Sequence, residues 1–552
     1  MDALLALLEH LKEWRIYLRR ELGDFQTPLP LVKLVLDCLG RSGKQWARVI
    51  EPTCGYGNFV KGLLELAAPP REIQAFELQQ DYLEEVGKLG YDGSSTRVIL
   101  KHADIFRLNL QRDLQWRESG PLLVLGNPPW VTNAELGSLG SDNLPVKANI
   151  KQLRGIAAMT GESNFDIAEA IWLKLIRELA AEQPTIALLC KTAVARSVLQ
   201  FAYDQQLPIT DASLWLIDAK KWFDAAVDAC LFCVQVGAGE RRYEADIYPD
   251  LCTVESISTL GFVGNQLVND MKSYRAVQSI DGSFPLAWRQ GLKHDAASVM
   301  ELTCDATGHL INKLGEGVIV EPTHLYPLVK SSDLFNGPLD RPQKMVIVTQ
   351  ATLGEDTRAL KYTSPLLWNY LMAHYETFAR RKSSIYTRQP PFAMFGIGDY
   401  AFAPYKVAIS GLHKTPRFRA IGPVDSRPVM LDDTCYFIPC YTPGTTAFLV
   451  SLLNDPACLD FIKAIVFLDA KRPITKKLLQ RIDLKALFTR INKDALALRM
   501  RQTLTEMREN SEVMPWSSID AFLAAYTERS GSDCMHISEQ QARSATQLSW
   551  IG

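Results

Sequence analysis

The sequence predicts an α/β domain built on a mostly parallel sheet, followed by a second domain of α+β type. The first domain is predicted by short apolar runs that alternate with helical patterns between about residues 24 and 245. Such alternation is typical of a parallel sheet with helices on both faces. The second domain is predicted by a change of pattern after about residue 341, where short strands, aromatic residues and one basic helical segment follow one another.

Seven apolar runs have the length and composition of strands in the first domain. They are Arg48–Ile50, Glu72–Phe76, Val98–Lys101, Leu122–Leu125, Thr185–Leu189, Ser213–Ile217 and Cys230–Val236. The helical patterns between them include Pro30–Leu39, Phe59–Leu66, Gln80–Leu89 and Phe165–Ala180. Ligands of such sheets bind at the carboxyl ends of the strands, so the residues that follow each run are the candidate site.

The patterns divide the chain into five parts. Residues 1–23 carry apolar side chains at helical spacing, which predicts an N-terminal docking helix. The α/β domain covers 24–245, a less regular connecting region covers 246–340, the second domain covers 341–510 and a polar tail covers 511–552.

Length and composition suit two or three ordinary globular domains. The chain has 552 residues, of which 47% are hydrophobic and 22% charged, with a formal net charge of −2. A net charge so close to zero does not indicate a particular partner, so a surface that binds nucleic acid must be locally basic. No apolar run is long enough to span a bilayer, and the segment after Met1 lacks the layout of a signal peptide.

The 11 cysteines are scattered along the chain. Cys230 and Cys233 have the C-x-x-C spacing, but an extended run points them to opposite faces. No second cysteine pair or histidine pair completes a zinc signature. We therefore expect no metal site, and reduced core thiols in a cytoplasmic protein.

The first predicted strand runs into a turn that contains Glu51, Thr53, Gly55 and Gly57. The two glycines permit a tight turn and a close approach of the backbone to a ligand. A lone G-x-G is weak evidence, because an ordinary turn between a strand and a helix also contains glycine.

Acidic residues follow the next two strands. A carboxylate at Glu77 can accept hydrogen bonds from both hydroxyls of a ribose. Asp104 can accept from the amino group of an adenine ring while Ile105 packs on the face of that ring. A solvated charge explains each residue taken alone. Their order after successive strands predicts a site for a nucleoside that bears an amino-acid tail.

Upstream, Thr27 suits the N-cap of a helix and Pro28 suits its first position. Capping is the simplest role for Thr27. The free amide groups of that helix start could also hold a carboxylate.

The fourth strand ends in Asn127, Pro128, Pro129 and Trp130, which form the most specific motif in the chain. Two successive prolines continue neither a strand nor a helix, and they leave the Pro128 carbonyl without a local donor. Asn127 adds a second, uncharged oxygen acceptor. Two such acceptors suit the amino group of an aromatic ring, because they draw its lone pair out of conjugation and make the nitrogen nucleophilic. Trp130 supplies a stacking face for a base taken out of a duplex.

Two further segments are candidates for contact with the substrate or cofactor. Residues 131–163 form a long polar loop that carries lysines and an arginine, which predicts a flexible substrate-contacting segment. The helix start around Asp166 either lines the cofactor pocket or belongs to the core. Phe223, or alternatively Trp222, could form the second wall of a base pocket opposite Trp130, although a buried core aromatic is nearly as good an interpretation.

The chain resembles the gamma-class N6-adenine DNA methyltransferases of restriction–modification and related phage-defence systems. The resemblance rests on the order of its motifs: Thr27-Pro28, the glycine turn, Asn-Pro-Pro-aromatic, and then a C-terminal recognition region. It implies a Rossmann-like class I methyltransferase domain with a mixed seven-stranded sheet and a C-terminal target-recognition domain of α+β type. The implied cofactor is S-adenosyl-L-methionine and the implied partner is double-stranded DNA.

The same resemblance assigns roles to individual residues. Residues implied to bind the cofactor are Thr27, Pro28, Glu51, Thr53, Gly55, Gly57, Glu77, Asp104, Ile105 and Asn127. Residues implied to hold and methylate the base are Asn127, Pro128, Pro129 and Trp130, with Phe223 stacking opposite. The sequence departs from the family at two positions, because Trp130 replaces a tyrosine or phenylalanine and Ile105 stands where an aromatic residue is common.

Positive charge gathers in two places of the C-terminal half, near residues 371–420 and 471–493. Clusters of this kind suit phosphate contacts, which position DNA without reading its sequence. A solvated helix face also explains the second cluster. The stretch Phe395–Val407 and the stretch Lys471–Lys477 also resemble recognition regions of the family. The candidate DNA-binding residues are Arg381, Lys382, Tyr386, Lys406, Lys414, Lys471, Arg472, Lys476 and Lys477.

Several alternatives stay open at the level of sequence. The Asn-Pro-Pro-aromatic motif also serves enzymes that methylate N4 of cytosine, RNA or a protein glutamine, and a chain that has lost catalysis could still bind a DNA site. We expect a monomer, without a membrane partner and with a cognate restriction endonuclease or defence protein as a separate chain. The recognition sequence and the residues that read it are not deducible, because readout depends on which side chains enter the groove.

Overall fold

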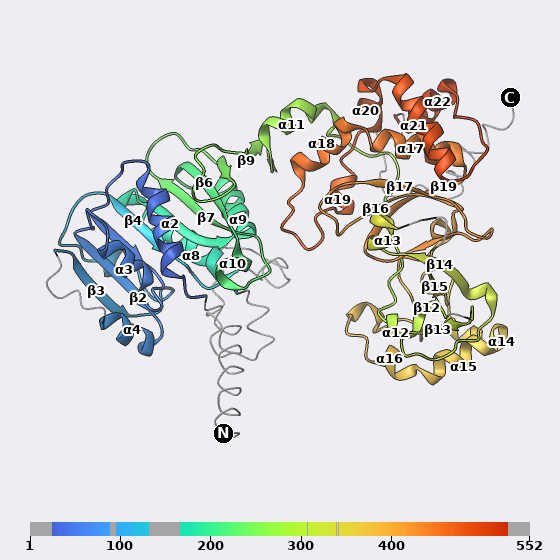
Figure 1. Ribbon diagram of the computed structural model, residues 1–552, viewed down its shortest axis with the longest axis horizontal. Coiled ribbons are helices and arrows are strands. Elements are labelled where there is room, and N and C mark those ends of the chain that lie inside the picture. Colours follow the sequence, from blue (N-terminus) through green and yellow to red (C-terminus); the bar gives the residue numbers. More distant parts are fainter. Residues whose placement is uncertain are drawn as a thin grey trace. The chain divides into compact units, whose positions relative to one another are not determined.

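The computed structural model describes residues 25–88, 95–131, 166–305, 307–337, 339 and 342–527. The chain divides into two compact units, residues 1–272 and 273–552, and each is described by itself (Figure 1). The predicted docking helix 1–23, nearly all of the predicted loop 131–163 and the end of the polar tail lie outside the described residues.

All seven predicted strands are present in the first unit. They are β1 (Arg48–Glu51), β2 (Glu72–Glu77), β3 (Arg97–His102), β4 (Leu122–Gly126), β5 (Thr185–Lys191), β6 (Ile209–Ile217) and β7 (Ala229–Val236). Their order is β3-β2-β1-β4-β5-β7-β6, in which β7 runs antiparallel to both of its neighbours. The prediction of a mixed seven-stranded sheet is therefore confirmed.

The sheet is larger than predicted, because three more strands continue it beyond β6. These are β8 (Ala245–Tyr248), β9 (Ser258–Val263) and β10 (Gln266–Val268), which bring the sheet to ten strands. β8 pairs with β6 in parallel, and Asp246 of β8 lies opposite Ser213 of β6. The start of the expected connecting region 246–340 therefore belongs to the first unit, since backbone pairing with an exposed strand edge captures it.

Alternation along the strands buries both faces of this sheet. Val49 and Leu123 pack in one apolar cluster with residues of three helices: α2 (Leu29–Gly40), α3 (Asn58–Leu64) and α10 (Ala219–Phe223). Phe232 follows Leu231 of that cluster and so points to the opposite face, where its ring lies 4.7 Å from Trp172 of α8 (Ile167–Glu178). The other α-helices among the described residues of the unit are α4 (Gln80–Gly87), α5 (Leu110–Asp113) and α9 (Thr192–Asp204).

The second unit has two sheets and a set of helices, as predicted for an α+β domain. The first sheet has the order β11-β19-β16-β17 and the second has the order β13-β12-β15-β14-β18. Its strands are β11 (Arg289–Gln290), β12 (Glu301–Cys304), β13 (Leu310–Ile311), β14 (Leu325–Val329), β15 (Lys344–Ile347), β16 (Tyr405–Ser410), β17 (Phe418–Ile421), β18 (Met430–Leu431) and β19 (Cys435–Cys440). Its helices are α11 (Met271–Val277), which begins in the first unit, α12 (Ala297–Met300), α13 (Ser331–Asn336), α14 (Leu360–Thr363), α15 (Pro365–Ala373), α16 (Tyr375–Ala379), α17 (Pro443–Leu453), α18 (Pro456–Ile465), α19 (Lys476–Leu479), α20 (Leu484–Arg490), α21 (Lys493–Glu506) and α22 (Trp516–Thr527).

The second unit begins well before the expected boundary at residue 341. β11 pairs with β19, and β12 and β14 both pair with β15, so strands from the expected connecting region complete the sheets of the second unit. The connecting region 246–340 is therefore divided between the two units. Its strands are only two to six residues long, which left no clear period-2 pattern to identify them.

Among the described residues, no helix is both long enough and apolar enough to cross a membrane.

Two glycines allow a test of the packing between α2 and α3. A Cβ atom at Gly62 of α3 would lie 2.5 Å from a methyl carbon of Val32, whereas a Cβ atom at Gly87 of α4 would meet nothing within 4 Å. We expect Gly62→Ala to destabilise the protein by about 1–3 kcal/mol despite its better helix propensity, because valine cannot move aside. Gly87→Ala, the matched control, should stabilise it by about 0.4–1 kcal/mol. Urea denaturation of the two variants measures their free energies of unfolding. Equal stabilisation by both substitutions would contradict this packing.

Candidate active site

The carboxyl ends of β1 and β2 are joined by backbone hydrogen bonds. The N–H of Cys54 donates to the carbonyl of Phe76 at 2.8 Å, and the N–H of Gly55 donates to Oε2 of Glu77 at 2.8 Å. Gly55 and Gly57 have φ angles of +52° and +72°, a conformation that side chains with a Cβ rarely adopt. The predicted glycine turn is therefore present, and it lies beside the predicted acidic residue.

The Glu77 side chain is held by three backbone donors. Besides the bond from Gly55, its Oε1 accepts from the N–H groups of Leu78 and Gln79 at 2.9 Å each. The side chain is buried and fixed in position at the end of β2. Its carboxylate therefore has a fixed orientation at the edge of the sheet where a ligand of this fold binds.

Glu51 is a buried carboxyl group with an unfilled hydrogen-bonding capacity. Burial, and then the charge of Glu77, raises the pKa of Glu51 well above its ordinary value. Within the described part of the chain, its Oε2 atom is buried and has no hydrogen-bond partner. An unsatisfied buried acceptor costs roughly 1–3 kcal/mol. A ligand that offers an ammonium or hydroxyl group here would recover that cost, so the site suits a cofactor with an amino-acid tail.

Asp104 and Ile105 follow β3 but differ in exposure. Asp104 accepts from the N–H of Phe106 at 2.9 Å and lies 3.5 Å from the guanidinium of Arg107, which makes it the first residue of a tight turn. Ile105 is buried. Asp104 is therefore positioned by the turn, while Ile105 is already packed in the domain.

The Thr27-Pro28 element differs from its prediction by one residue. Helix α2 begins at Leu29, its N-cap is Pro28, and no side chain caps it, so Thr27 is not the predicted cap. The N–H groups of Leu31 and Val32 both donate to the Pro28 carbonyl, at 2.9 and 3.0 Å. Pro30 has no N–H to offer. The helix start thus has fewer free amides for a carboxylate than expected.

The residues before that helix contact both the glycine turn and the Asn-Pro-Pro turn. The Tyr56 N–H donates to Oε1 of Gln26 at 3.0 Å, and Nδ2 of Asn58 donates to the Thr27 carbonyl at 2.9 Å. Nδ2 of Asn127 donates to the Phe25 carbonyl at 2.7 Å. Sequence reasoning missed Phe25, Gln26 and Asn58, because no local pattern marks a contact between segments that are far apart in the chain.

The two polar atoms of the Asn127 side-chain amide differ in their hydrogen bonding. Its Nδ2 is bound by the Phe25 carbonyl, whereas its Oδ1 is buried and has no partner among the described residues. Nor does any hydrogen bond of the described residues end on the carbonyl of Pro128. Thr53 donates to the backbone carbonyl of Asn127 at 3.5 Å, while Pro129 is half-buried beside it. The turn therefore holds two uncharged acceptors ready for an amino group.

Trp130 lies in an aromatic cluster with Phe25 and Phe223. Its ring centroid is 5.5 Å from that of Phe25 and 5.1 Å from that of Phe223, which it meets at 69°. All three side chains pack in the core beneath the sheet ends. To hold a base between Trp130 and Phe223, the rings would have to separate to about 7 Å, twice the contact distance of carbon atoms. Phe223 as the second wall therefore stays a prediction, as does the alternative, its half-buried neighbour Trp222.

Asp166 begins helix α8 close to this turn. It caps the helix by accepting from the N–H of Ala168 at 3.0 Å, and it pairs with Lys191 at 2.9 Å. Ile167 is buried and its N–H donates to the carbonyl of Val131 at 3.0 Å. At this helix start the core interpretation fits Ile167, whereas the preceding residue, Phe165, lies outside the described residues.

Four of the predicted DNA-binding residues have structural roles in the second unit. Lys406 is 1% exposed, its Nζ donates to the Ala403 carbonyl at 2.7 Å, and burial lowers its pKa to about 7. Arg381 donates to the carbonyl of Ala393 at 2.8 Å and lies 3.7 Å from the ring centroid of Tyr386. Arg472 pairs with Asp433 at 3.0 Å. Burial thus argues against a phosphate contact by Lys406, whereas internal bonds hold Arg381 and Arg472, and the Tyr386 ring lies beneath the Arg381 guanidinium. Of these four side chains, that of Lys406 is fully buried and the other three are half-buried.

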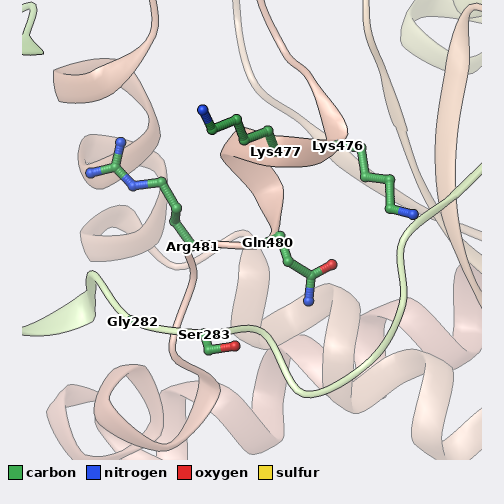
Figure 2. A pocket seen from close by; sticks show the side chains of 6 residues that line it. All are labelled: Gly282, Ser283, Lys476, Lys477, Gln480 and Arg481. Atoms are coloured by element: carbon green, nitrogen blue, oxygen red, sulfur yellow. The ribbon is translucent and has the colours of Figure 1, made fainter. Parts of the chain in front are cut away.

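The remaining candidates are exposed: Lys382, Lys414, Lys471, Lys476 and Lys477. Two of them line a pocket of the second unit together with Gly282, Ser283, Gln480 and Arg481. Figure 2 shows the Lys476 and Lys477 side chains pointing apart from α19, above the loop of Gly282 and Ser283. Arg481 is engaged with Asp281, and Gln480 donates to the Leu286 carbonyl at 3.2 Å, so the floor is held by internal bonds.

The sheet order, the glycine turn and the acidic residues at the strand ends define a class I S-adenosylmethionine-dependent methyltransferase. The chain is 35% identical over 468 residues to the Type II methyltransferase M.NspV of Nostoc sp. (strain ATCC 29411 / PCC 7524). The aligned region covers 85% of this chain and 97% of that protein. The chain therefore belongs to the type II methyltransferases of restriction–modification systems. No family model matches it.

Solved structures resemble the chain more distantly. The restriction–modification enzyme MmeI, solved in complex with DNA, aligns with 100% of this chain and 77% of its own at 12% identity and a TM-score of 0.47. An S-adenosylmethionine-dependent O-methyltransferase of Thermotoga maritima aligns with 38% of this chain and 66% of its own at 14% identity and a TM-score of 0.24.

The raised pKa of Glu51 predicts a pH-dependent cost of folding. The unfolded chain loses this proton near pH 4.5, the ordinary value, while the folded protein keeps it to higher pH. The contribution of Glu51 to stability therefore falls as pH rises above that value. We expect the melting temperature of Glu51→Gln minus that of the wild type to increase between about pH 5 and pH 8.

Glu72→Gln is the matched control, since Glu72 is also buried but its Oε2 accepts from the N–H groups of Arg117 and Glu118 at 2.9 and 3.0 Å. It should lower the melting temperature instead, because an amide supplies only one acceptor atom. A difference between Glu51→Gln and the wild type that stays constant across this pH range would contradict the assignment.

Proposed function

We propose that the protein transfers a methyl group to N6 of an adenine that is flipped out of a specific DNA site. The observation that supports this most directly is the Asn127 amide, whose nitrogen is anchored while its buried oxygen has no partner among the described residues. An exocyclic amino group has two N–H donors, which fit this oxygen and the carbonyl of the following residue, Pro128, which accepts no hydrogen bond from the described residues. Adenine N6 is favoured over cytosine N4 because the motif of N4 enzymes more often begins with serine or threonine.

The chemistry assigned to this chain is positioning and polarisation. Oδ1 of Asn127 and the Pro128 carbonyl accept the two N–H bonds of the amino group, which localises its lone pair on nitrogen. The cofactor supplies an electrophilic methyl group on sulfonium. Asn127 cannot serve as a strong base, so the extra proton on nitrogen leaves after methyl transfer, to solvent. Orientation and preorganised acceptors then supply most of the rate.

Trp130 is proposed to hold the plane of the base. Removing a base from a duplex costs a few kcal/mol, and stacking on an aromatic ring offsets part of it. The contact of Trp130 with Phe25 and Phe223 fixes the indole before the base arrives. A rigid ring loses less side-chain entropy on binding than a mobile one would.

For DNA we propose that the exposed lysines around α19 contact phosphates. Lys476 and Lys477 flank a pocket without an acidic residue in its lining. The proposal also includes a monomeric, cytoplasmic enzyme and a separate cognate endonuclease or other defence protein.

The reaction is tested by expressing the wild type and Asn127→Ala in a host that lacks adenine methylation and sequencing its DNA for modified bases. We expect N6-methyladenine at one recurring site with the wild type and none with Asn127→Ala, because both the acceptor and the anchor of the turn are lost. Asn369→Ala, the same change at an exposed position of α15, should methylate as the wild type does. N4-methylcytosine, or no modified base with the wild type, would contradict the proposal.

The phosphate contacts are tested by the salt dependence of DNA binding. Each phosphate contact contributes about −0.9 to the slope of log affinity against log salt. Lys476→Gln combined with Lys477→Gln should therefore make the slope less negative by about 2. Lys406→Met should leave the slope unchanged, since that ammonium group is buried. A slope that changes with Lys406→Met and not with the double variant would reverse this assignment.

A further inference from the structure

The segment Phe25–Pro28 contacts both halves of the candidate active site. On one side, Oε1 of Gln26 accepts from the N–H of Tyr56, and the Thr27 carbonyl accepts from Nδ2 of Asn58. Both donors belong to the glycine turn and the start of α3. On the other side, the Phe25 carbonyl accepts from Nδ2 of Asn127.

This last bond sets the orientation of the Asn127 amide. An amide can rotate by half a turn and exchange its oxygen and nitrogen, which would present a donor to an amino group instead of an acceptor. The Phe25 carbonyl only accepts, so it binds the nitrogen and leaves the oxygen on the other side. The orientation therefore depends on where the Phe25 carbonyl lies.

The position of that carbonyl depends in turn on the two bonds to the glycine turn. The segment is short, and Pro28 restricts it by fixing φ. The Gln26 amide also packs over Gly55, where a Cβ atom would lie 2.5 Å from Oε1 of Gln26. The glycine turn thereby fixes Gln26 and Thr27, and these hold the carbonyl of Phe25 one residue away.

We propose that Gln26 and Asn58 are positioning residues for methyl transfer: they hold the Phe25–Pro28 segment against the glycine turn so that the Phe25 carbonyl keeps Asn127 Oδ1 turned toward the target amino group. Neither side chain touches the base. The inference rests on the proposed function, in which Asn127 Oδ1 is an acceptor for the amino group. It also couples the cofactor side of the site to the target side, because one segment is bonded to both.

The test compares Gln26→Met with Gln26→Glu in the full-length protein. Methionine keeps the length of the side chain but cannot accept from the Tyr56 N–H, whereas glutamate keeps an acceptor oxygen. We expect Gln26→Met to lower the single-turnover methylation rate about tenfold or more at saturating cofactor and DNA, because a small misplacement of an acceptor is costly. Affinity for DNA should stay within about twofold of the wild type, since the segment makes no proposed DNA contact. Gln26→Glu should restore most of the rate.

Two further variants complete the design. Gln200→Met makes the same change on α9, where the Gln200 side chain donates to Asp204 at 3.0 Å, and it should leave the rate unchanged. Asn58→Asp replaces the donor to the Thr27 carbonyl with a carboxylate. Its rate should be low at neutral pH and should rise, relative to the wild type, as pH falls and the protonated acid regains a donor. Thermal melting of each variant verifies that the domain is folded.

The outcomes separate the two ideas. A wild type that methylates no adenine removes the proposed function itself, whatever Gln26 does. An active wild type with an unchanged single-turnover rate in Gln26→Met overturns the inference. So does a loss confined to cofactor affinity, or an equal loss in Gln26→Glu, because each would assign the segment to cofactor binding or to packing alone.

Discussion

The parallel pairing of β1 with both β2 and β4 is the constraint on which the site depends. Arg48 lies opposite Glu72 on one side and opposite Leu122 on the other, so the three strands start level and end at the same edge. Their carboxyl ends deliver the glycine turn, Glu77 and the Asn-Pro-Pro turn side by side. A shift of one residue in either pairing would turn each of these side chains to the other face of the sheet.

At this edge the protein leaves buried acceptors without donors, although most buried polar groups in proteins are satisfied. Glu51 Oε2 lies in the cofactor half and Asn127 Oδ1 in the target half, and both are without partners among the described residues. Each costs folding free energy that a bound ligand can return. Glu77, in contrast, is held by three backbone donors.

The second unit shows why charge in a sequence is a poor guide to a DNA surface. Lys406 and Lys476 are both lysines in basic stretches that resemble recognition regions, yet one is buried against a backbone carbonyl and the other is exposed at a pocket. Strand β16 alternates its side chains between two faces, and residue 406 falls on a buried one. A short helix such as α19 leaves its lysines outside because only Leu479 of its residues is buried.

The sequence by itself determined the seven strands, the glycine turn, the acidic residues and the Asn-Pro-Pro turn, because each depends on local periodicity or on the backbone preferences of glycine and proline. Only the tertiary structure decided that β8–β10 extend the first sheet and that β11–β14 complete the sheets of the second unit, since the pairing of a short strand depends on which edge is available. It alone also decided that Phe25 orients Asn127, that Trp130 and Phe223 are in contact, and that Lys406 is buried. Contacts between distant segments arise from packing in three dimensions, and no spacing along the chain encodes them.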